Sequence, residues 1–437
     1  MEWSADPELV EKKKPELATL SSLTWTSDQE LALKILASEN NVFLTGGAGT
    51  GKSTVIQEFM KKGEGIAVLA STGTAAILLG GRTFHSFFGL GIMEGGQEQV
   101  VERALRYRGI VQRLRKTKII LIDEISMIGG PEFQTAERIA RKARANSAPW
   151  GGLRVVVVGD FAQLPPVVRS VPGEMQEGRP WSFLTDTWRN SMFDSLLLKT
   201  IVRSKDADWN YILNEVRWGE ISRDSMDVLQ SRISPVPLEF QGTRLFPRRI
   251  QVELLNQERL KTLKSAAREY STIYIGQAQK VDELKRNAPI PEVLVLKEGA
   301  LVMFRQNDPE YKFVNGTLGT VRKMKDNEVS VELFSGKTIE LKPVTFSVLD
   351  AEGEPVATAT NFPLNLAWAC TIHKAQGATL DRVHADLRGV WEHGQSYVAL
   401  SRVRSLSDLT LEGISSRGFP VDPEVRSFYS NLRPTQS

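Results

Sequence analysis

The sequence predicts an α/β protein with two parallel-sheet domains and an all-β insertion in the second. Short β-branched runs alternate with helical stretches in the first half of the chain, and this alternation resumes after residue 363. Such alternation is typical of parallel strands joined by crossover helices. Between the two parts, residues 300–362 contain short alternating strands broken by turn signals, which predicts a small barrel.

The first domain is predicted from its buried strands, which are β-branched and end in loop residues. We expect strands at residues 41–45, 66–71, 119–123 and 155–160, and helices at 53–62 and 131–145. In doubly wound sheets, ligands bind at the carboxyl ends of the strands. The second domain is expected to begin near residue 198, with a helix through 209–218 and a strand and helix within 243–263.

Composition excludes several classes of protein. The 437 residues are 41% hydrophobic and 24% charged, and no apolar run could span a bilayer. The mixed charges of residues 1–20 indicate a frayed terminus and not a targeting peptide. Because Cys370 is the single cysteine, a disulfide framework is excluded, and four histidines make a zinc site improbable. A reducing compartment fits this composition.

A local basic run is more informative than the net charge of +3. It contains seven cations and no acid, and its members are Arg103, Arg106, Arg108, Arg113, Arg115, Lys116 and Lys118. This field could attract phosphate. A solvated helix face leading into a strand explains the same run equally well.

The strongest motif is a glycine-rich loop that follows the first strand and precedes a helix. Residues 46–53 read GGAGTGKS, which has the spacing of a phosphate-binding loop. Its backbone NH groups can surround phosphates, while Lys52 reaches the β and γ oxygens and Ser53 ligates Mg²⁺. We expect nucleotide contacts along the loop and the first helical turn: Gly47, Ala48, Gly49, Thr50, Gly51, Lys52, Ser53 and Thr54.

Two further strand ends carry polar residues suited to nucleotide hydrolysis. Asp123 could hold the magnesium shell while its neighbour Glu124 polarises the attacking water, although an acidic pair at a strand end can also cap a helix. Gln163 follows the strand at 155–160 and could sense the γ-phosphate, unless it is an ordinary loop amide. Arg203 and Arg402 are candidate arginine fingers from the far side of the cleft.

Several motifs in order resemble those of the PIF (petite integration frequency) helicases of superfamily one. They are residues 71–76 (STGTAA), 83–87 (TFHSF), 159–166 (GDFAQLPP), 371–377 (TIHKAQG) and 394–402 (GQSYVALSR). The resemblance covers roughly residues 23–411. It implies a 5′-to-3′ DNA helicase that uses ATP and Mg²⁺, opens duplexes and RNA–DNA hybrids, and resolves G-quadruplexes. Single-stranded, forked and partial duplex DNA are the implied partners.

The family fold implies two RecA-like domains, a small wedge in the first and an SH3-like barrel in the second. The expected division is a flexible terminus at 1–21, domain one at 22–90 and 114–196, the wedge at 91–113, domain two at 197–264 and 363–437, and the barrel insertion at 265–362. We expect a monomer, located in the cytoplasm if bacterial, or in the nucleus or mitochondrion if it is the core of a eukaryotic protein.

The resemblance also implies roles for individual residues. Gln29 is similar to the glutamine that reads adenine, and Arg203 and Arg402 to the phosphate-facing arginines. Residues resembling the strand-contacting positions are Thr72, Thr74, His85, Ser86, Thr371, His373 and Lys374. Phe84, Phe87 and Phe88 could stack on bases, but core packing explains them at least as well.

Two departures and one alternative function remain open. The family usually has Phe-Arg-Gln where this chain has Val202-Arg203-Ser204. The chain lacks a long N-terminal extension, so it resembles the compact bacterial form or an excised core. A nucleotide-switched protein that clamps single strands without translocating would also keep Lys52 and Ser53, but it would have no need for Glu124.

Overall fold

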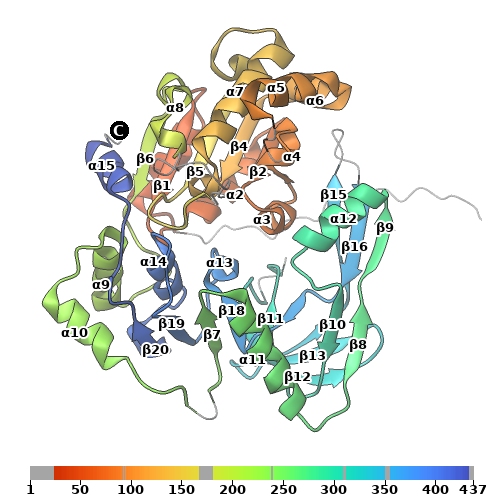
Figure 1. Cartoon of the computed structure of the whole chain (residues 1–437), viewed down its shortest axis with the longest axis vertical. Helices are drawn as coiled ribbons and strands as arrows, with labels where there is room; N and C mark the ends of the chain where they lie inside the picture. Colours follow the sequence, from red (N-terminus) through yellow and green to blue (C-terminus); the bar gives the residue numbers. More distant parts are fainter. Residues whose placement is uncertain are drawn as a thin grey trace, which may run out of the picture.

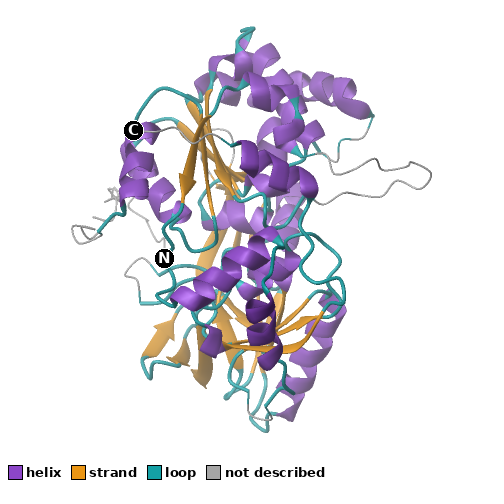
Figure 2. Cartoon of the chain, turned by 90° about the vertical axis from the view of Figure 1, so that its left-hand side faces the viewer, coloured by secondary structure: helices purple, strands orange, loops and turns teal. Residues whose placement is uncertain are grey.

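The computed structural model describes residues 24–432, except residues 92, 94, 167–180, 238–239, 309–311 and 350–354. The terminus expected to be flexible, 1–21, lies outside the described residues. Within them, the chain forms two parallel sheets and three antiparallel sheets. The larger parallel sheet occupies the upper half of the molecule and the other sheets lie below it (Figures 1 and 2).

A six-stranded parallel sheet defines the first lobe, with the strand order β3-β2-β4-β5-β1-β6. Its strands are β1 (Val42–Gly46), β2 (Ile66–Ala70), β3 (Arg82–Thr83), β4 (Ile119–Asp123), β5 (Arg154–Gly159) and β6 (Asp194–Leu198). The four strands predicted from sequence are β1, β2, β4 and β5, each within one residue of the expected bounds. Because β5 lies between β4 and β1, the glycine-rich loop, the acidic pair and the loop with Gln163 lie at the ends of three neighbouring strands.

Helices cover both faces of this sheet. They are α1 (Ser27–Leu36), α2 (Lys52–Lys62), α3 (Gly73–Leu78), α4 (Phe84–Phe88), α5 (Gly96–Arg106), α6 (Arg108–Lys116), α7 (Gly130–Arg144) and α8 (Asp186–Asn190), with short 3-10 turns at Ile125–Met127, Pro149–Gly152 and Ser182–Leu184. Successive residues of β1 point to opposite faces. Val42 and Leu44 therefore pack with α1 and α2, whereas Phe43 packs with α7.

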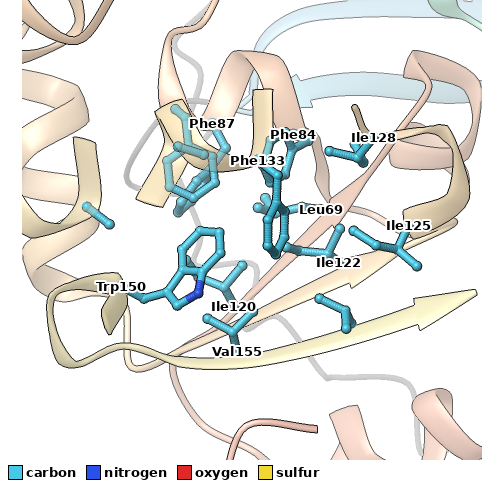
Figure 3. Close-up of a cluster of buried hydrophobic side chains, with 14 of the residues drawn as sticks. Leu69, Phe84, Phe87, Ile120, Ile122, Ile125, Ile128, Phe133, Trp150 and Val155 are labelled. Carbon is cyan, nitrogen blue, oxygen red and sulfur yellow. The ribbon is translucent and has the colours of Figure 1, made fainter. Parts of the chain in front are cut away.

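The α7 face holds a large aromatic core. Phe133 and Trp150 lie over Ile120 and the neighbouring strands, as Figure 3 shows. The T-shaped pair of Phe133 and Trp150 has a centroid distance of 4.9 Å. The three phenylalanines of α4 are part of this core and are at most 2% exposed. They are therefore core residues, and not a base-stacking surface.

The segment expected as a wedge, 91–113, is mostly helical where it is described and shares the core of the first lobe. Val100 and Ala104 are fully buried in that core. The basic run is divided between buried and exposed positions, and its attraction for phosphate stays a prediction. Arg113 donates to Phe87 O at 2.7 Å and lies over the Phe87 ring, which fastens α6 to α4. Arg106 and Arg108 are exposed at the junction of α5 and α6.

A four-stranded parallel sheet defines the second lobe, with the order β18-β7-β19-β20. Its strands are β7 (Thr243–Phe246), β18 (Ala369–Thr371), β19 (Val383–Leu387) and β20 (Leu409–Ile414), and its helices are α9 (Ala207–Trp218), α10 (Arg223–Ser231), α11 (Arg249–Thr262), α13 (Ile372–Ala375) and α14 (Gln395–Leu400), with a 3-10 turn at Leu406–Asp408. The predicted helix at 209–218 and the strand and helix within 243–263 are α9, β7 and α11.

Antiparallel sheets form between β7 and β18. The alternating pattern predicted their strands within residues 300–362, but not the three strands that precede residue 300. Five strands pair in the order β14-β13-β12-β11-β17, and a second sheet contains β10 and β8. The strands are β8 (Arg268–Ser271), β10 (Val293–Leu296), β11 (Leu301–Phe304), β12 (Leu318–Met324), β13 (Val329–Leu333), β14 (Thr338–Leu341) and β17 (Leu364–Leu366). Both sheets contribute to one buried core.

The expected single barrel stays a prediction, because the strands of residues 300–362 belong to two separate sheets. Strands β15 (Val344–Leu349) and β16 (Pro355–Asn361) pair with β9 (Ile273–Gly276) in a separate three-stranded sheet. Phe346, Ala357 and Ala359 are buried with Leu284 of α12 (Ala278–Asn287). The apolar side of this hairpin is thus covered by a helix, which alternation within the strands alone could not reveal.

The last described helix, α15 (Pro423–Asn431), returns from the second lobe to the first. Figure 1 shows it beside β6. Trp181 of the first lobe donates its indole NH to Asp422 at the start of the helix, at 3.1 Å. Phe428 stacks on Phe183 with a centroid distance of 4.4 Å and contacts the ring of Phe161. The first lobe therefore completes its aromatic core with residues that follow the second lobe.

Replacing Phe428 by alanine should destabilise the first lobe. Removal of a large aromatic side chain from a core costs up to about 3–5 kcal/mol, and Phe428 is only partly buried, so the lower part of that range is expected. Thermal unfolding should show a lower transition temperature for Phe428→Ala. Tyr211→Ala, at a position that is 60% exposed on α9, should leave it nearly unchanged. An unchanged transition for Phe428→Ala would contradict the role of α15 in the core.

Candidate active site

The glycine-rich loop connects β1 to α2 and has the conformation that its glycines permit. Gly49 and Gly51 have φ angles of +82° and +83°, in the left-handed region that glycine adopts without steric cost. Lys52 is the first residue of α2, and its ammonium donates to Gly46 O at 2.8 Å and Gly47 O at 3.1 Å. Burial lowers the pKa of Lys52, and the nearby carboxylates oppose this shift.

A cavity of about 240 Å³ lies beside this loop and has walls from both lobes. The first lobe contributes residues of the loop, the two carboxylates at the end of β4, and Gln163, and the second part of the chain contributes the two candidate arginines. The sequence-predicted residues that line it are Ala48, Gly49, Gly51, Lys52, Ser53, Thr54, Asp123, Glu124, Gln163, Arg203 and Arg402. Sequence positions far apart thus converge on one small volume.

The carboxylates of Asp123 and Glu124 emerge together from the end of β4. Glu124 has φ +53° and ψ +49°, a left-handed conformation that costs a non-glycine residue roughly 1–2 kcal/mol. Strain of this kind is concentrated at functional sites. Burial, and then the charge of Glu124, raise the pKa of Asp123 to about 7. Burial also raises the pKa of Glu124, which Lys52 counteracts.

The oxygen atoms of Asp123 and Ser53 are suited to bind a divalent cation. Asp123 supplies a carboxylate and Ser53 a hydroxyl on the same cavity wall, and oxygen ligands are those that Mg²⁺ prefers. Two adjacent buried carboxylates repel each other, and a positive ion near Asp123 would offset that repulsion. No cluster of three or more histidine, cysteine or acidic side chains occurs in the described ranges, so a cation here would rely on water and substrate oxygens.

The two arginines form the opposite wall of the cavity. The guanidinium of Arg402 is 1% exposed and donates to Val398 O at 2.7 Å, to Ala375 O and Ala378 O, and to the Ser401 hydroxyl. Burial, together with the neighbouring charge of Arg203, lowers the pKa of Arg402 to about 9. Two close guanidinium groups at a cavity wall create a local field that favours an anion.

The segment at Arg203 also touches the glycine loop directly. The backbone NH groups of Val202 and Arg203 both donate to Gly49 O, at 2.9 and 3.1 Å. The Arg203 guanidinium donates to Ser401 O at 3.3 Å. The Val-Arg-Ser departure from the family pattern therefore keeps the arginine at the cavity. A Cβ added to Gly49 would lie 2.8 Å from the Arg203 side chain, so the loop needs glycine at this position.

Gln29 and Gln163 differ in what their amides contact. Gln29 lies behind the loop, where its side-chain NH₂ donates to Thr50 O at 3.0 Å and its oxygen accepts from Thr26 N. Its proposed contact with adenine stays a prediction. Gln163 lines the cavity and is 6% exposed, and its amide lies 3.5 Å from an Asp160 oxygen.

The candidate strand-contacting residues follow the carboxyl ends of β2, β3 and β18. Thr72 and Thr371 cap α3 and α13, and each hydroxyl accepts a backbone NH of the first turn. Each hydroxyl therefore keeps its own hydrogen for a donor role. Thr74 lies on α3, and His85 and Ser86 on α4. Lys374 is exposed, while His373 lies near the Trp391 ring and burial lowers its pKa, which favours the neutral imidazole.

Sequence reasoning missed a buried network next to the glycine loop. Arg217 of α9 donates to both oxygens of Asp160, at 2.8 and 3.2 Å. Tyr429 of α15 bonds to Thr45 and to the same carboxylate, and Tyr397 accepts the NH of Ala48 at 2.7 Å. Burial lowers the pKa of Arg217, but Asp160 reverses this and holds it above the usual range.

One signal in the sequence could have indicated Arg217. It follows Leu213 by four residues and Trp209 by eight, so it belongs to the apolar stripe of α9, which is buried. An arginine on such a stripe requires a partner, because a buried unpaired charge is costly. The partner, Asp160, is more than fifty positions away, and no local pattern identifies it.

Replacing Arg217 by leucine should destabilise the protein strongly, because Asp160 would stay buried without its counterion. Breaking a buried pair by removing one partner costs about 3–5 kcal/mol. The variant Arg217→Leu/Asp160→Leu should recover part of the loss, since it leaves no unpaired charge. Urea unfolding of the two variants and the unaltered protein measures both effects. Equal stability of Arg217→Leu and the unaltered protein would disprove the importance of the pair.

Comparisons with known proteins agree with this geometry. The family described as PIF1-like helicase matches residues 26–221. The ATP-dependent DNA helicase Pif1 of Bdellovibrio bacteriovorus is 44% identical over 95% of this chain and 94% of its own length.

Two solved structures of Bacteroides Pif1 were also compared. The complex with ADP-AlF4 gives a TM-score of 0.82 at 29% identity, covering 93% of this chain and 97% of the other. The complex with single-stranded DNA gives 0.65 at 28% identity, covering 93% and 96%. The sequence match and the shared fold together establish that this chain belongs to the PIF1-like helicase family and is an ATP-dependent DNA helicase.

Proposed function

We propose that this helicase moves 5′ to 3′ along single-stranded DNA and unwinds duplexes, RNA–DNA hybrids and G-quadruplexes. The observation that carries the proposal is the cavity with walls from both lobes, next to threonine-capped helices at the strand ends of both sheets. A nucleotide bound there contacts both lobes at once. Its hydrolysis therefore changes how favourable the closed arrangement of the two lobes is relative to the open one. The direction of movement is inferred from the family resemblance.

The cavity residues suggest a division of labour in hydrolysis. The ammonium of Lys52 and the guanidinium groups of Arg203 and Arg402 hold the β- and γ-phosphates of ATP, and Glu124 accepts a proton from the attacking water. Gln163 lies where it can contact the γ-phosphate. Ser53 and Asp123 would hold Mg²⁺, which neutralises charge on the phosphate oxygens when bound.

The strand would be held by its phosphates, without recognition of base sequence. Hydroxyl groups at Thr72 and Thr371, backbone NH groups of the short helices that follow them, and the ammonium of Lys374 are suited to this task. The two helices follow strands of different lobes, so movement of the lobes changes the distance between their two phosphate contacts. The DNA strand advances if the two lobes bind and release it in turn.

Division of the chain into domains and its oligomeric state are part of the same proposal. We propose residues 22–90 and 114–196 as the first motor domain, and 197–264 and 363–437 as the second, with 265–362 as the insertion; α15, at the end of the second range, packs on the first domain. The exposed junction of α5 and α6 is the proposed strand-separating wedge, and the protein is proposed to act as a monomer.

The described helices include none with the length and apolar character of a membrane span. By its single cysteine and bacterial relative we propose a cytoplasmic location.

Two variants should separate nucleotide binding from turnover. Lys52→Ala removes the phosphate-facing ammonium and should abolish hydrolysis. Glu124→Gln keeps the shape of the side chain but cannot accept the proton, so kcat should fall about 100-fold or more while ATP binding is retained. Steady-state hydrolysis with oligo-dT and equilibrium binding of a fluorescent ATP analogue provide the two readouts. A near-normal rate in Lys52→Ala, or lost nucleotide binding in Glu124→Gln, would refute these roles.

Direction and fuel can be tested in one strand-displacement experiment. Partial duplexes carrying either a 5′ or a 3′ single-stranded tail are incubated with ATP, with a non-hydrolysable analogue, or with ATP and Glu124→Gln. We expect displacement with the 5′-tailed substrate, ATP and the unaltered protein alone. Displacement from the 3′ tail would reverse the assigned direction. Strand binding without displacement from either tail would favour the clamp that does not translocate.

A further inference from the structure

One hydrogen bond connects the strand-binding motif of the second lobe to the hydrolytic carboxylate of the first. The side-chain NH₂ of Gln376 donates to Oε2 of Glu124 at 3.1 Å. Gln376 follows α13 directly, and its backbone NH bonds to His373 O at 3.3 Å. A residue at the end of the candidate strand-binding helix therefore touches the group proposed to activate water.

The orientation of the Gln376 amide is fixed by the charge that it faces. Its NH₂ group donates to a carboxylate, and the reverse orientation would direct a carbonyl oxygen at the same negative group. The carbonyl oxygen, Oε1, is buried and accepts no hydrogen bond from the described residues. An unsatisfied buried acceptor is unfavourable, so the cost at Oε1 offsets part of the gain from the hydrogen bond to Glu124. A contact with a small net free energy can be made in one state of the protein and released in another.

The chain around Gln376 is coupled to the cavity on both sides. Arg402 donates to Ala375 O at 3.2 Å and to Ala378 O at 3.1 Å, which holds the loop that contains Gln376. Gly377 lines the cavity and has φ +76°. Thr371, four positions before Ala375, caps α13 and is a candidate contact of the strand. Because α13 is a single short turn, a shift at Thr371 is transmitted to Gln376.

We infer that Gln376 restrains Glu124 when no DNA is bound and releases it when a strand engages α13. While the amide donates to Oε2, that oxygen is occupied, so the carboxylate has one oxygen fewer with which to accept a proton from the attacking water. Release makes both oxygens accessible to water. Gln376 is thus a positioning residue that links strand binding to hydrolysis. The inference rests on the proposed role of Glu124.

Measurement of hydrolysis with and without DNA tests the inference. In Gln376→Leu, which keeps the volume but removes the donor, kcat without DNA should rise about tenfold to a hundredfold, the effect of losing one hydrogen bond to a charged group. With saturating oligo-dT, kcat should stay within about twofold of the unaltered protein, so the stimulation by DNA falls. KM for ATP, affinity for oligo-dT without nucleotide and the thermal transition should be unchanged.

Matched variants control the experiment. Gln376→Asn keeps the amide, but its shorter side chain cannot reach Glu124, so it should behave like Gln376→Leu. Gln230→Leu removes an exposed glutamine from α10 and should change none of these values. Combining Gln376→Leu with Glu124→Gln should abolish the raised rate, because that rate depends on the carboxylate.

Three outcomes would overturn the inference. A lower kcat both with and without DNA would show that Gln376 orients Glu124 for catalysis instead of restraining it. Unchanged kcat in both Gln376 variants would show that the contact has no kinetic role. A lower thermal transition together with a general loss of activity would show a purely structural role. Failure of the proposed function is distinguishable, because Glu124→Gln alone would then retain hydrolysis.

Discussion

The buried ion pair between Asp160 and Arg217 is the constraint on which the interlobe geometry depends. Asp160 directly follows β5, and Arg217 lies in the last turn of α9 in the second lobe. A charge at 0% exposure is tolerated only with a partner, so the two lobes must meet at this position or leave both charges unpaired. The tyrosines of α14 and α15 extend the same network to Ala48 and Thr45. The phosphate loop is therefore supported from both lobes.

This network lies directly beside the cavity. Asp160 contacts Arg217 through its carboxylate and lies next to the amide of Gln163, which lines the cavity. On the opposite wall, Arg402 fixes the loop after α13. Guanidinium groups make both contacts: Arg217 bonds to a carboxylate at 2.8 and 3.2 Å, and Arg402 to two backbone carbonyls at 3.1 and 3.2 Å.

Local chemistry predicted those parts of the protein whose signals lie within a few residues. Four of the six strands of the first lobe, the glycine loop and the acidic pair at the end of β4 could be predicted because burial, turn chemistry and spacing are local properties. Strands β3 and β6 were not predicted. The separate sheet of β9, β15 and β16 was missed because its covering helix, α12, lies far upstream in sequence. The pairing of Arg217 with Asp160 and the contact of Gln376 with Glu124 were missed for the same reason. They depend on how the two lobes meet, which the spacing of residues in one segment does not encode.

The position of α15 has a consequence for the synthesis of the chain. The sheet of the first lobe ends at Leu198, but α15, which adds Phe428 to the aromatic core, begins at Pro423. A ribosome adds the roughly 225 residues between them in about 10–45 s. During that interval Phe161 and Phe183 lack the ring of Phe428, so the nascent first lobe has an exposed hydrophobic surface of aromatic side chains. Its maturation must wait for the polypeptide that follows the second lobe, which makes this surface a natural target for chaperones during translation.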